Sequence, residues 1–489
     1  MKKYIFISFL ILLFGNHVFA NNLVMSTPVY DNSAKTISFT IAWDNSWKVT
    51  TGPSNWDGVW VFVKRQACSN SNIWATALLS SNSGDHTSSA GTNLLTIDAV
   101  SDGMGVFIRR NAAGIGSIGT HSITLALNSG LTTQPAITAS ASDNFKVIGT
   151  EMVYVPQGGF YLGDGRGTNT SNFSGGNNAS TPLYIDGAIQ AAGLGSSTNY
   201  TSNPIYGCPG NLPATFPLGY NGFWCMKYEL SMVAYTEFLN CLTYDQQAAR
   251  LEKWGGRYPN VNGASFTNAG YKGALAVTTA GTYNTVPAVF SNNPTYSSYS
   301  PVSYLSWRDL TAYLDWAGLR PMTEFEYEKA CRGPLIPVLG EKAWGTEDIA
   351  QFQYISTTYG CSSETQTYFA LGLCNYQTGR MHRAGSAASS ITDRVHAGAT
   401  YYGILDMTGS TYERCVGGWN YDYSTYTTAN GDGNINSNGS CGMTIWNNMQ
   451  YMNRGGSAQN GQSIQVSVRN YNNDPGYGNI NAGRGVRSF

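Results

Sequence analysis

The stretch PVSYLSWRDLTAYLDWAGLRPMTEFEYEKACRG, residues 301–333, predicts two short helices with defined starts. Ser306 can cap the first helix, because Asp309 at its third position can reach back to the cap. Thr323 and Glu326 form the same pair for the second helix, which ends at a glycine. Apolar residues at helical spacing give the first helix a buried face. The stretch therefore predicts a pair of capped helices in a domain that also contains sheets.

Upstream of these helices, short segments alternate apolar and polar residues, as half-buried strands do. These segments are residues 36–43 (TISFTIAW), 58–63 (GVWVFV), 105–109 (GVFIR) and 122–127 (SITLAL). Their spacing predicts an all-β sandwich over residues 21–147.

Four tryptophans of this region suggest either a core or a carbohydrate-stacking surface. Trp43 and Trp60 lie within strand patterns, so we expect them in the core. Trp47 and Trp56 remain candidates for an exposed contact surface.

The first 20 residues have the pattern of a signal peptide. Lys2 and Lys3 precede an apolar run over residues 4–14, and Val18-x-Ala20 resembles a cleavage site. The run is too short to span a bilayer, and no later segment is long and apolar enough to do so. We therefore expect an exported protein without a membrane span, located outside the cell, at its surface or in the periplasm.

The composition excludes one class of partner and predicts a redox environment. The formal net charge is −1 and no basic run is present, which argues against nucleic-acid binding. Nine cysteines would meet an oxidising compartment after export, so some disulfides are expected. Because nine is odd, at least one cysteine is free or pairs with another chain.

Six sequence blocks follow one another over the last two-thirds of the chain. They are residues 152–163 (MVYVPQGGFYLG), 223–240 (FWCMKYELSMVAYTEFLN), 301–333, 401–419 (YYGILDMTGSTYERCVGGW), 454–457 (RGGS) and 483–487 (GRGVR). In this order they resemble the formylglycine-generating-enzyme, or sulfatase-modifying factor, domain. The resemblance implies an α+β, loop-rich C-type-lectin-like domain over residues 148–489, after the sandwich. A Gly-, Asn- and Ser-rich insertion occupies about residues 168–217.

The catalytic residues of that family are missing from this sequence. The family's enzyme uses two cysteines that follow the RGGS block and resemble a copper(I) thiolate site. Asn460 and Gln465 stand at those two positions, and residues 442–489 contain no cysteine. The iron-dependent branch of the same fold uses three histidines, and no HxxxH pair occurs here. We therefore expect neither copper nor iron, no catalytic residues, and structural roles for His382 and His396.

Charged residues of the helical stretch could instead suggest acid–base chemistry. In the family these positions belong to the scaffold, where arginine and glutamate tie loops together through charged hydrogen bonds. We expect the same here. The residues are Arg320, Glu324, Glu326 and Glu328.

The resemblance also implies structural calcium. One of the family's sites uses an Asn and a Glu in a block that here keeps Glu413 but has Ser410 in place of the Asn. Asn375 resembles a ligand of a second site. Asn375, Ser410 and Glu413 are thus the candidate calcium residues, with hard oxygen donors.

The C-terminal loops are the candidate recognition surface for a protein or carbohydrate ligand. From residue 430 onward the chain is dense in Asn, Gly, Ser and Tyr, which resembles antibody loops and variable C-type-lectin-like segments. The alternative is that Asn and Gly only supply turns. The candidate residues are Asn460, Gln465, Asn470, Tyr471 and Tyr477.

These observations predict an exported, non-catalytic binding or structural protein. One alternative is an enzyme of uncharacterised chemistry related to formylglycine-generating enzyme. Another is a scaffold subunit of a secretion, adhesion or motility assembly, which rests on fold analogy alone.

Overall fold

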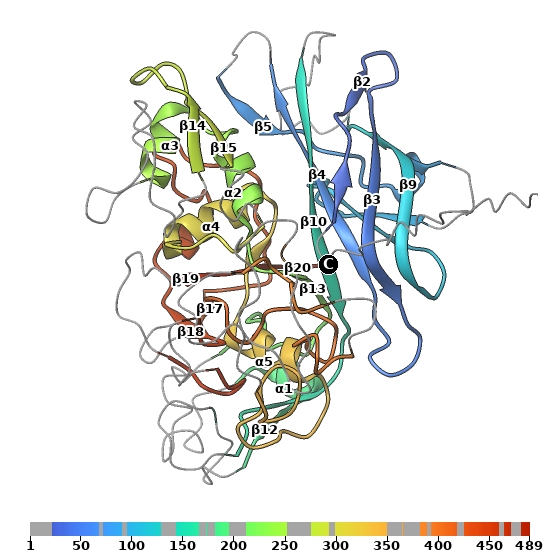
Figure 1. Cartoon of the computed structure of the whole chain (residues 1–489), viewed down its shortest axis with the longest axis vertical. Coiled ribbons are helices and arrows are strands. Elements are labelled where there is room, and N and C mark those ends of the chain that lie inside the picture. Colours follow the sequence, from blue (N-terminus) through green and yellow to red (C-terminus); the bar gives the residue numbers. More distant parts are fainter. Residues whose placement is uncertain are drawn as a thin grey trace, which may run out of the picture.

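The computed structural model is mostly β-sheet, with few and short helices (Figure 1). It describes residues 22–67, 72–89, 95–128, 143–165, 173, 181–194, 212–251, 275–292, 299–349, 364, 382–388, 393–417, 425–458, 464–470 and 481–489. Most of the expected insertion at 168–217 lies outside these ranges. Within them, no helix is long and apolar enough to cross a membrane.

The first sheet consists of five strands from the N-terminal region. Two long antiparallel strands form its centre, and three short strands flank them. The long strands are β3 (Thr36–Lys48) and β9 (Gly114–Ala126), and the short ones are β1 (Val24–Met25), β2 (Val29–Asp31) and β6 (Thr87–Ser88).

The second sheet joins both halves of the chain. Its strands run in the order β16, β20, β13, β10, β4, β8, β7, with β5 also paired to β4. They are β4 (Asp57–Gln66), β5 (Trp74–Thr76), β7 (Leu95–Ala99), β8 (Val106–Arg110), β10 (Asn144–Val155), β13 (Phe223–Met226), β16 (Arg320–Pro321) and β20 (Gly485–Ser488).

The expected boundary between residues 147 and 148 falls inside β10. This strand pairs with β4 from Asn144 to Val153 and with β13 from Met152 to Val155. The N-terminal region and the family-like region therefore share one continuous sheet.

Alternation along β4 explains why the sheet has a core on each face. Val59, Val61 and Val63 are buried against Ile37 and Phe39 of the first sheet. Because successive side chains point to opposite faces, Trp60 and Phe62 belong to a different core on the helical side. Figure 1 shows the resulting order, with the first sheet, the second sheet and the helices as successive layers.

Aromatic side chains join the second sheet to the helical layer. Phe107 stacks on Trp224 with ring centroids 4.2 Å apart, and Phe62 meets Trp316 edge-on at 5.1 Å. The indole of Trp60 donates to the Ala317 carbonyl oxygen at 2.8 Å. The prediction that Trp43 and Trp60 are core residues is confirmed.

Both predicted helices are present. α4 (Trp307–Trp316) begins after Ser306 and α5 (Glu324–Arg332) begins after Thr323, each with the predicted capping box. The other elements of this half are α2 (Met232–Leu239), α3 (Tyr244–Arg250), α6 (Thr444–Asn447), β14 (Leu275–Thr279), β15 (Val289–Asn292), β17 (Tyr412–Val416), β18 (Tyr451–Arg454) and β19 (Asn481–Ala482).

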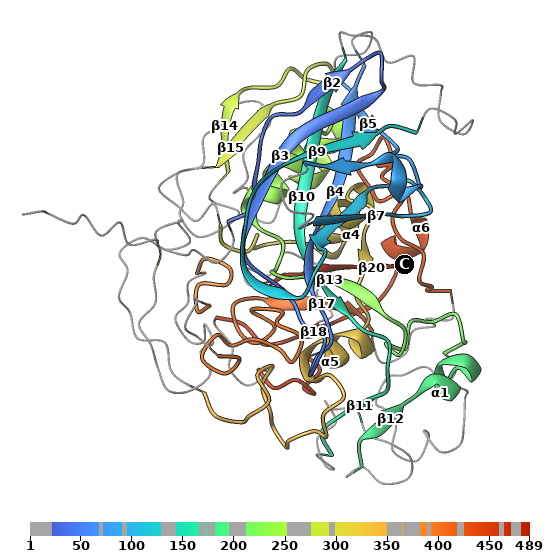
Figure 2. The same cartoon turned by 90° about the vertical axis from the view of Figure 1, so that its right-hand side faces the viewer.

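A small extension carries β11 (Phe160–Leu162), β12 (Leu183–Ile185) and α1 (Gly187–Ala192). Figure 2 shows it at the end of the molecule opposite β14 and β15.

Candidate functional site

The predicted recognition segment begins where β18 ends. Gly455 and Gly456 follow Arg454 with φ angles of 81° and 70°, a region that favours glycine. A Cβ on Gly456 would lie 2.5 Å from Ile464 Cγ2, so the returning chain packs directly on the glycine pair. Residues 464–470 are thereby held beside β18.

The structure describes two of the five predicted recognition residues. Gln465 and Asn470 are both half-buried. Asn470 exchanges two backbone hydrogen bonds with Asn453, and its side chain donates to the Tyr412 hydroxyl at 3.0 Å. Asn470 thus belongs to the framework of the segment. The others, Asn460, Tyr471 and Tyr477, lie outside the described residues.

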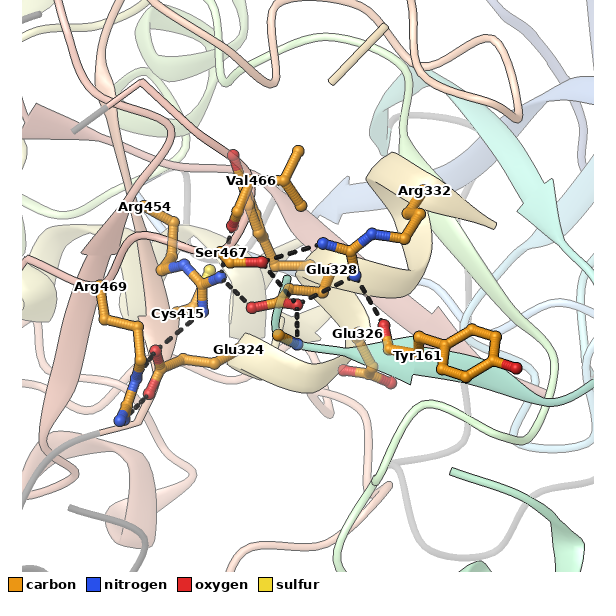
Figure 3. A network of polar contacts seen from close by, with 12 residues as sticks. Tyr161, Glu324, Glu326, Glu328, Arg332, Cys415, Arg454, Val466, Ser467 and Arg469 are labelled. Carbon is orange, nitrogen blue, oxygen red and sulfur yellow. Dashed lines mark hydrogen bonds and ion pairs between the residues drawn. The ribbon is translucent and has the colours of Figure 1, made fainter. Parts of the chain in front are cut away.

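A buried arginine connects the segment to α5 (Figure 3). Arg454 donates to Glu324 at 2.9 Å and to Glu328 at 2.7 Å. It also donates to the carbonyl oxygen of Val466 at 2.6 Å. Burial disfavours the charged guanidinium, but the two carboxylates outweigh it and raise the pKa of Arg454.

Two further arginines complete this network. Arg469 donates to both carboxylate oxygens of Glu324, at 2.7 and 2.6 Å. Arg332 donates to Glu328 at 3.1 Å and to the Ser467 hydroxyl at 2.9 Å. The segment 464–470 is therefore fixed to α5 by both its side chains and its backbone.

These pairings leave little room for acid–base chemistry on α5. Glu324 and Glu328 each accept from two arginines, and Glu326 forms a bidentate pair with Arg320 at 2.6 and 2.8 Å. Bidentate and shared arginine–carboxylate pairs of this kind tie separate segments of a fold together. The contacts support the scaffold interpretation.

Every cysteine within the described residues is buried and free of disulfides. Burial raises the pKa of Cys225 to about 12 and that of Cys241 to about 11. It also raises the pKa of Cys331, Cys415 and Cys441. None of these thiols is therefore an activated thiolate. Cys68, Cys208, Cys361 and Cys374 lie outside the described residues.

The described candidates for calcium are already engaged with protein groups. Both carboxylate oxygens of Glu413 accept from Arg484, at 2.6 and 2.8 Å. The Ser410 carbonyl oxygen accepts from the Ala458 amide at 2.9 Å. Arranged in this way, Ser410 and Glu413 do not fit a calcium ion. Asn375 lies outside the described residues.

The two C-terminal histidines each contact one carboxylate. His382 is buried and bonds through Nδ1 to Glu364. His396 is more exposed and bonds to Asp393 at 2.6 Å. The described part of the chain contains no group of three His, Cys, Asp or Glu side chains that could hold a metal ion.

Sequence reasoning missed an exposed apolar loop next to this site. Leu335, Ile336, Val338 and Leu339 are between 43% and 75% exposed. The loop leaves α5 and ends at Glu341, which pairs with Arg332 and whose carbonyl oxygen accepts from the Val466 amide. The apolar run of residues 335–339 was visible in the sequence and could have been noted.

Comparison with known families gives a match over most of the chain. The model of the sulfatase-modifying factor enzyme 1-like domain matches residues 139–488. This range includes β10, both capped helices and the segment 464–470.

Three curated relatives carry the name formylglycine-generating enzyme. The chain is 30% identical to that of Thermomonospora curvata over 126 residues, which is 25% of this chain and 35% of the relative. It is 30% identical to that of Mus musculus over 148 residues, covering 29% and 38% of the two chains. A 48-residue match to that of Streptomyces coelicolor is 52% identical and covers 10% and 14%. Even the longest of these three matches covers only 38% of the relative's length.

Proposed function

The chain belongs to the sulfatase-modifying factor enzyme 1-like family. We propose that it is an exported, non-catalytic binding protein, which uses the family's fold without its copper chemistry. The recognition surface comprises the predicted residues Asn460, Tyr471 and Tyr477, which lie outside the described residues, together with the apolar loop 335–339. The segment 464–470 is fixed by Arg454 and supports the apolar loop, because the Val466 amide donates to the Glu341 carbonyl oxygen.

The observation that carries this proposal is the state of the thiols. Copper(I) chemistry needs two accessible thiolates, since oxygen and amide ligands bind the soft ion poorly. No cysteine follows Cys441 in the sequence, and Gln465 stands at one of the thiol positions. The described cysteines are buried and have raised pKa values.

A peptide assay tests the loss of chemistry. The purified protein is incubated with a CxPxR-type sulfatase peptide and added copper, with the Streptomyces coelicolor enzyme as positive control. Mass spectrometry should detect no aldehyde above the no-protein control. Aldehyde formation that depends on this protein would overturn the proposal.

The apolar loop of residues 335–339 favours a protein partner. Exposed apolar side chains that gather in one place mark interaction sites, and Ile336 is 75% exposed. The loop is held at both ends, because the Gly333 amide donates to Lys329 and Glu341 pairs with Arg332. A held loop loses less conformational entropy when a partner binds.

The binding surface is tested with paired variants. Ile336→Ser with Leu339→Ser, and separately Tyr471→Ala with Tyr477→Ala, should weaken capture of the partner found with the wild type. Ile115→Ser is the matched control, because Ile115 is 80% exposed but lies on β9 of the first sheet. Equal binding by all variants would show that recognition lies elsewhere.

Export rests on the first 20 residues. Cleavage after Ala20 would give a mature chain that begins at Asn21. The intact mass of the protein purified from its native host checks this step. A mass that includes residues 1–20 would contradict cleavage.

A further inference from the structure

Arg484 lies in a buried cage of oxygen atoms between β19 and β20. Its guanidinium donates to both carboxylate oxygens of Glu413, at 2.6 and 2.8 Å. It also donates to the carbonyl oxygens of Met226 at 3.0 Å, Lys227 at 3.3 Å and Leu405 at 2.9 Å. Five oxygens from three chain segments thus converge on one cation.

This set of donors is the kind that calcium prefers. Calcium binds carboxylate oxygens, often as a bidentate pair, together with backbone carbonyl oxygens. A guanidinium carries five N–H donors and a permanent positive charge, so it can satisfy the same oxygens. The cage therefore already holds a cation that belongs to the chain.

Further carboxyl groups lie near the cage. Glu229 accepts from the Thr411 amide at 3.1 Å, and Asp406 accepts from the Gly385 amide at 2.5 Å. Burial raises the pKa of Glu229, as do Asp406 and Glu413 nearby. The buried Glu229 and Glu413 and the half-buried Asp406 thus lie around Arg484.

Glu229 also lies beside open space. It lines a cavity of about 80 Å³ together with Glu151 and Met226, and its Oε2 has no hydrogen-bond partner among the described residues. Without Arg484, the Glu413 carboxylate and three backbone carbonyl oxygens would lose their donor, next to a cavity lined by Met226 and Glu229.

We propose that the Arg484 guanidinium replaces a calcium ion in this cage, so that the fold needs no metal there and its removal uncovers a calcium site. The site is latent in the wild-type protein and consists of Glu413, the carbonyl oxygens of residues 226, 227 and 405, and Glu229.

The test compares thermal stability with calcium and with EDTA. The melting temperature of the wild-type chain should be the same under both conditions. Arg484→Ala should melt at a lower temperature in EDTA, and calcium should restore part of the loss, since a ligand of the native state stabilises it by mass action. Equilibrium dialysis should show one calcium ion bound per variant chain and none at this cage in the wild type.

Arg320→Ala is the matched control. Arg320 is also buried and bidentate on a glutamate, but its other partners are one carbonyl oxygen, that of Pro321, and the side chains of Ser488 and Tyr426. This variant should lose stability without recovery in calcium. Recovery of both variants would point to a general charge effect and overturn the assignment.

Two further results would also overturn the proposal. One is a lower melting temperature of the wild-type protein in EDTA than in calcium, caused by loss of an ion bound at Glu413. The other is a folded Arg484→Ala that binds no calcium. If Arg484→Ala does not fold in EDTA, refolding is the readout: recovery only with calcium supports the latent site, and failure in both conditions contradicts it.

Discussion

Buried arginines are the main polar residues that stabilise this fold. A buried guanidinium needs partners for its charge and for its N–H groups, and its planar fork suits paired carboxylate oxygens better than an ammonium does. Fully buried examples are Arg320, Arg332, Arg414, Arg454, Arg484 and Arg487. Arg454, Arg484 and Arg487 bond carboxylates from distant parts of the chain, so these arginines fix loops that have little regular structure.

Arg454→Met should destabilise the protein strongly. The change leaves Glu324 and Glu328 buried with one cation fewer, which typically costs about 3–5 kcal/mol. Urea denaturation followed by tryptophan fluorescence measures the loss. Arg454→Lys keeps the positive charge but loses the planar guanidinium. The midpoint of its urea denaturation should therefore fall between those of the wild type and Arg454→Met. An unchanged midpoint for the Met variant would mean that the network adds no stability.

Lys64 makes stability depend on pH. Burial lowers its pKa to about 7 from 10.5, although its Nζ donates to the Trp316 carbonyl oxygen at 2.6 Å. Between pH values of about 7 and 10.5, the unfolded chain binds more protons at this residue than the folded chain does, so the free energy of unfolding rises with pH. The expected slope is roughly 1 kcal/mol per pH unit. Lys64→Met should lose this slope when unfolding is measured across the same range, and an equal slope would contradict the assignment.

The candidate site shows what sequence could not predict at the residue scale. Asn470 suited a recognition loop by composition, but its partner Tyr412 is 58 positions away and fixes it in the framework. Glu413 matched a calcium motif, but Arg484 binds it from 71 positions away. Long-range partners of this kind leave no local signal.

Helix starts, by contrast, were predictable because caps are local. Ser306 and Asp309 satisfy each other's backbone amides within four residues, and Thr323 and Glu326 do the same. The strands of residues 36–43 and 58–63 were also predicted, although β3 and β4 extend beyond them. Their ends depend on pairing with other strands, which the alternation does not encode.

Ser306→Ala tests the cap of α4 directly. The amide of Asp309 would lose its acceptor at 3.1 Å, and loss of such a cap costs about 1 kcal/mol. The free energy of unfolding by urea should fall by that amount. Ser33→Ala, on the exposed turn between β2 and β3, is the control and should change little. Equal stability of both variants would show that packing alone sets the helix start.

At the scale of the whole molecule, the two sequence regions form one structure. β10 crosses the expected boundary, and side chains bridge it as well. Lys227 pairs with Asp57 at 3.2 Å, and Asn55 donates to the Tyr402 carbonyl oxygen at 2.8 Å. Hydrophobic alternation predicted the strands, but it could not show that they share a sheet with residues much later in the chain.

Residues 21–147 and 148–489 should therefore not fold as separate fragments. Cutting at this point divides β10 and exposes Trp60 and Phe62 on one fragment and Trp224 on the other. Each fragment alone should aggregate or lack near-ultraviolet circular dichroism, while co-expression should recover a soluble complex. Two separately folded, monomeric fragments would contradict the shared sheet.

The position of β20 has a consequence for how the chain is made. This strand lies between β13 and β16, so β13 has an unpaired edge until the ribosome has added Ser488. Bare sheet edges are templates for pairing with other chains. The nascent chain therefore has to be kept from intermolecular pairing from the time Met226 is added until Ser488 is added. A chaperone that binds β13 until β20 is available would meet this need.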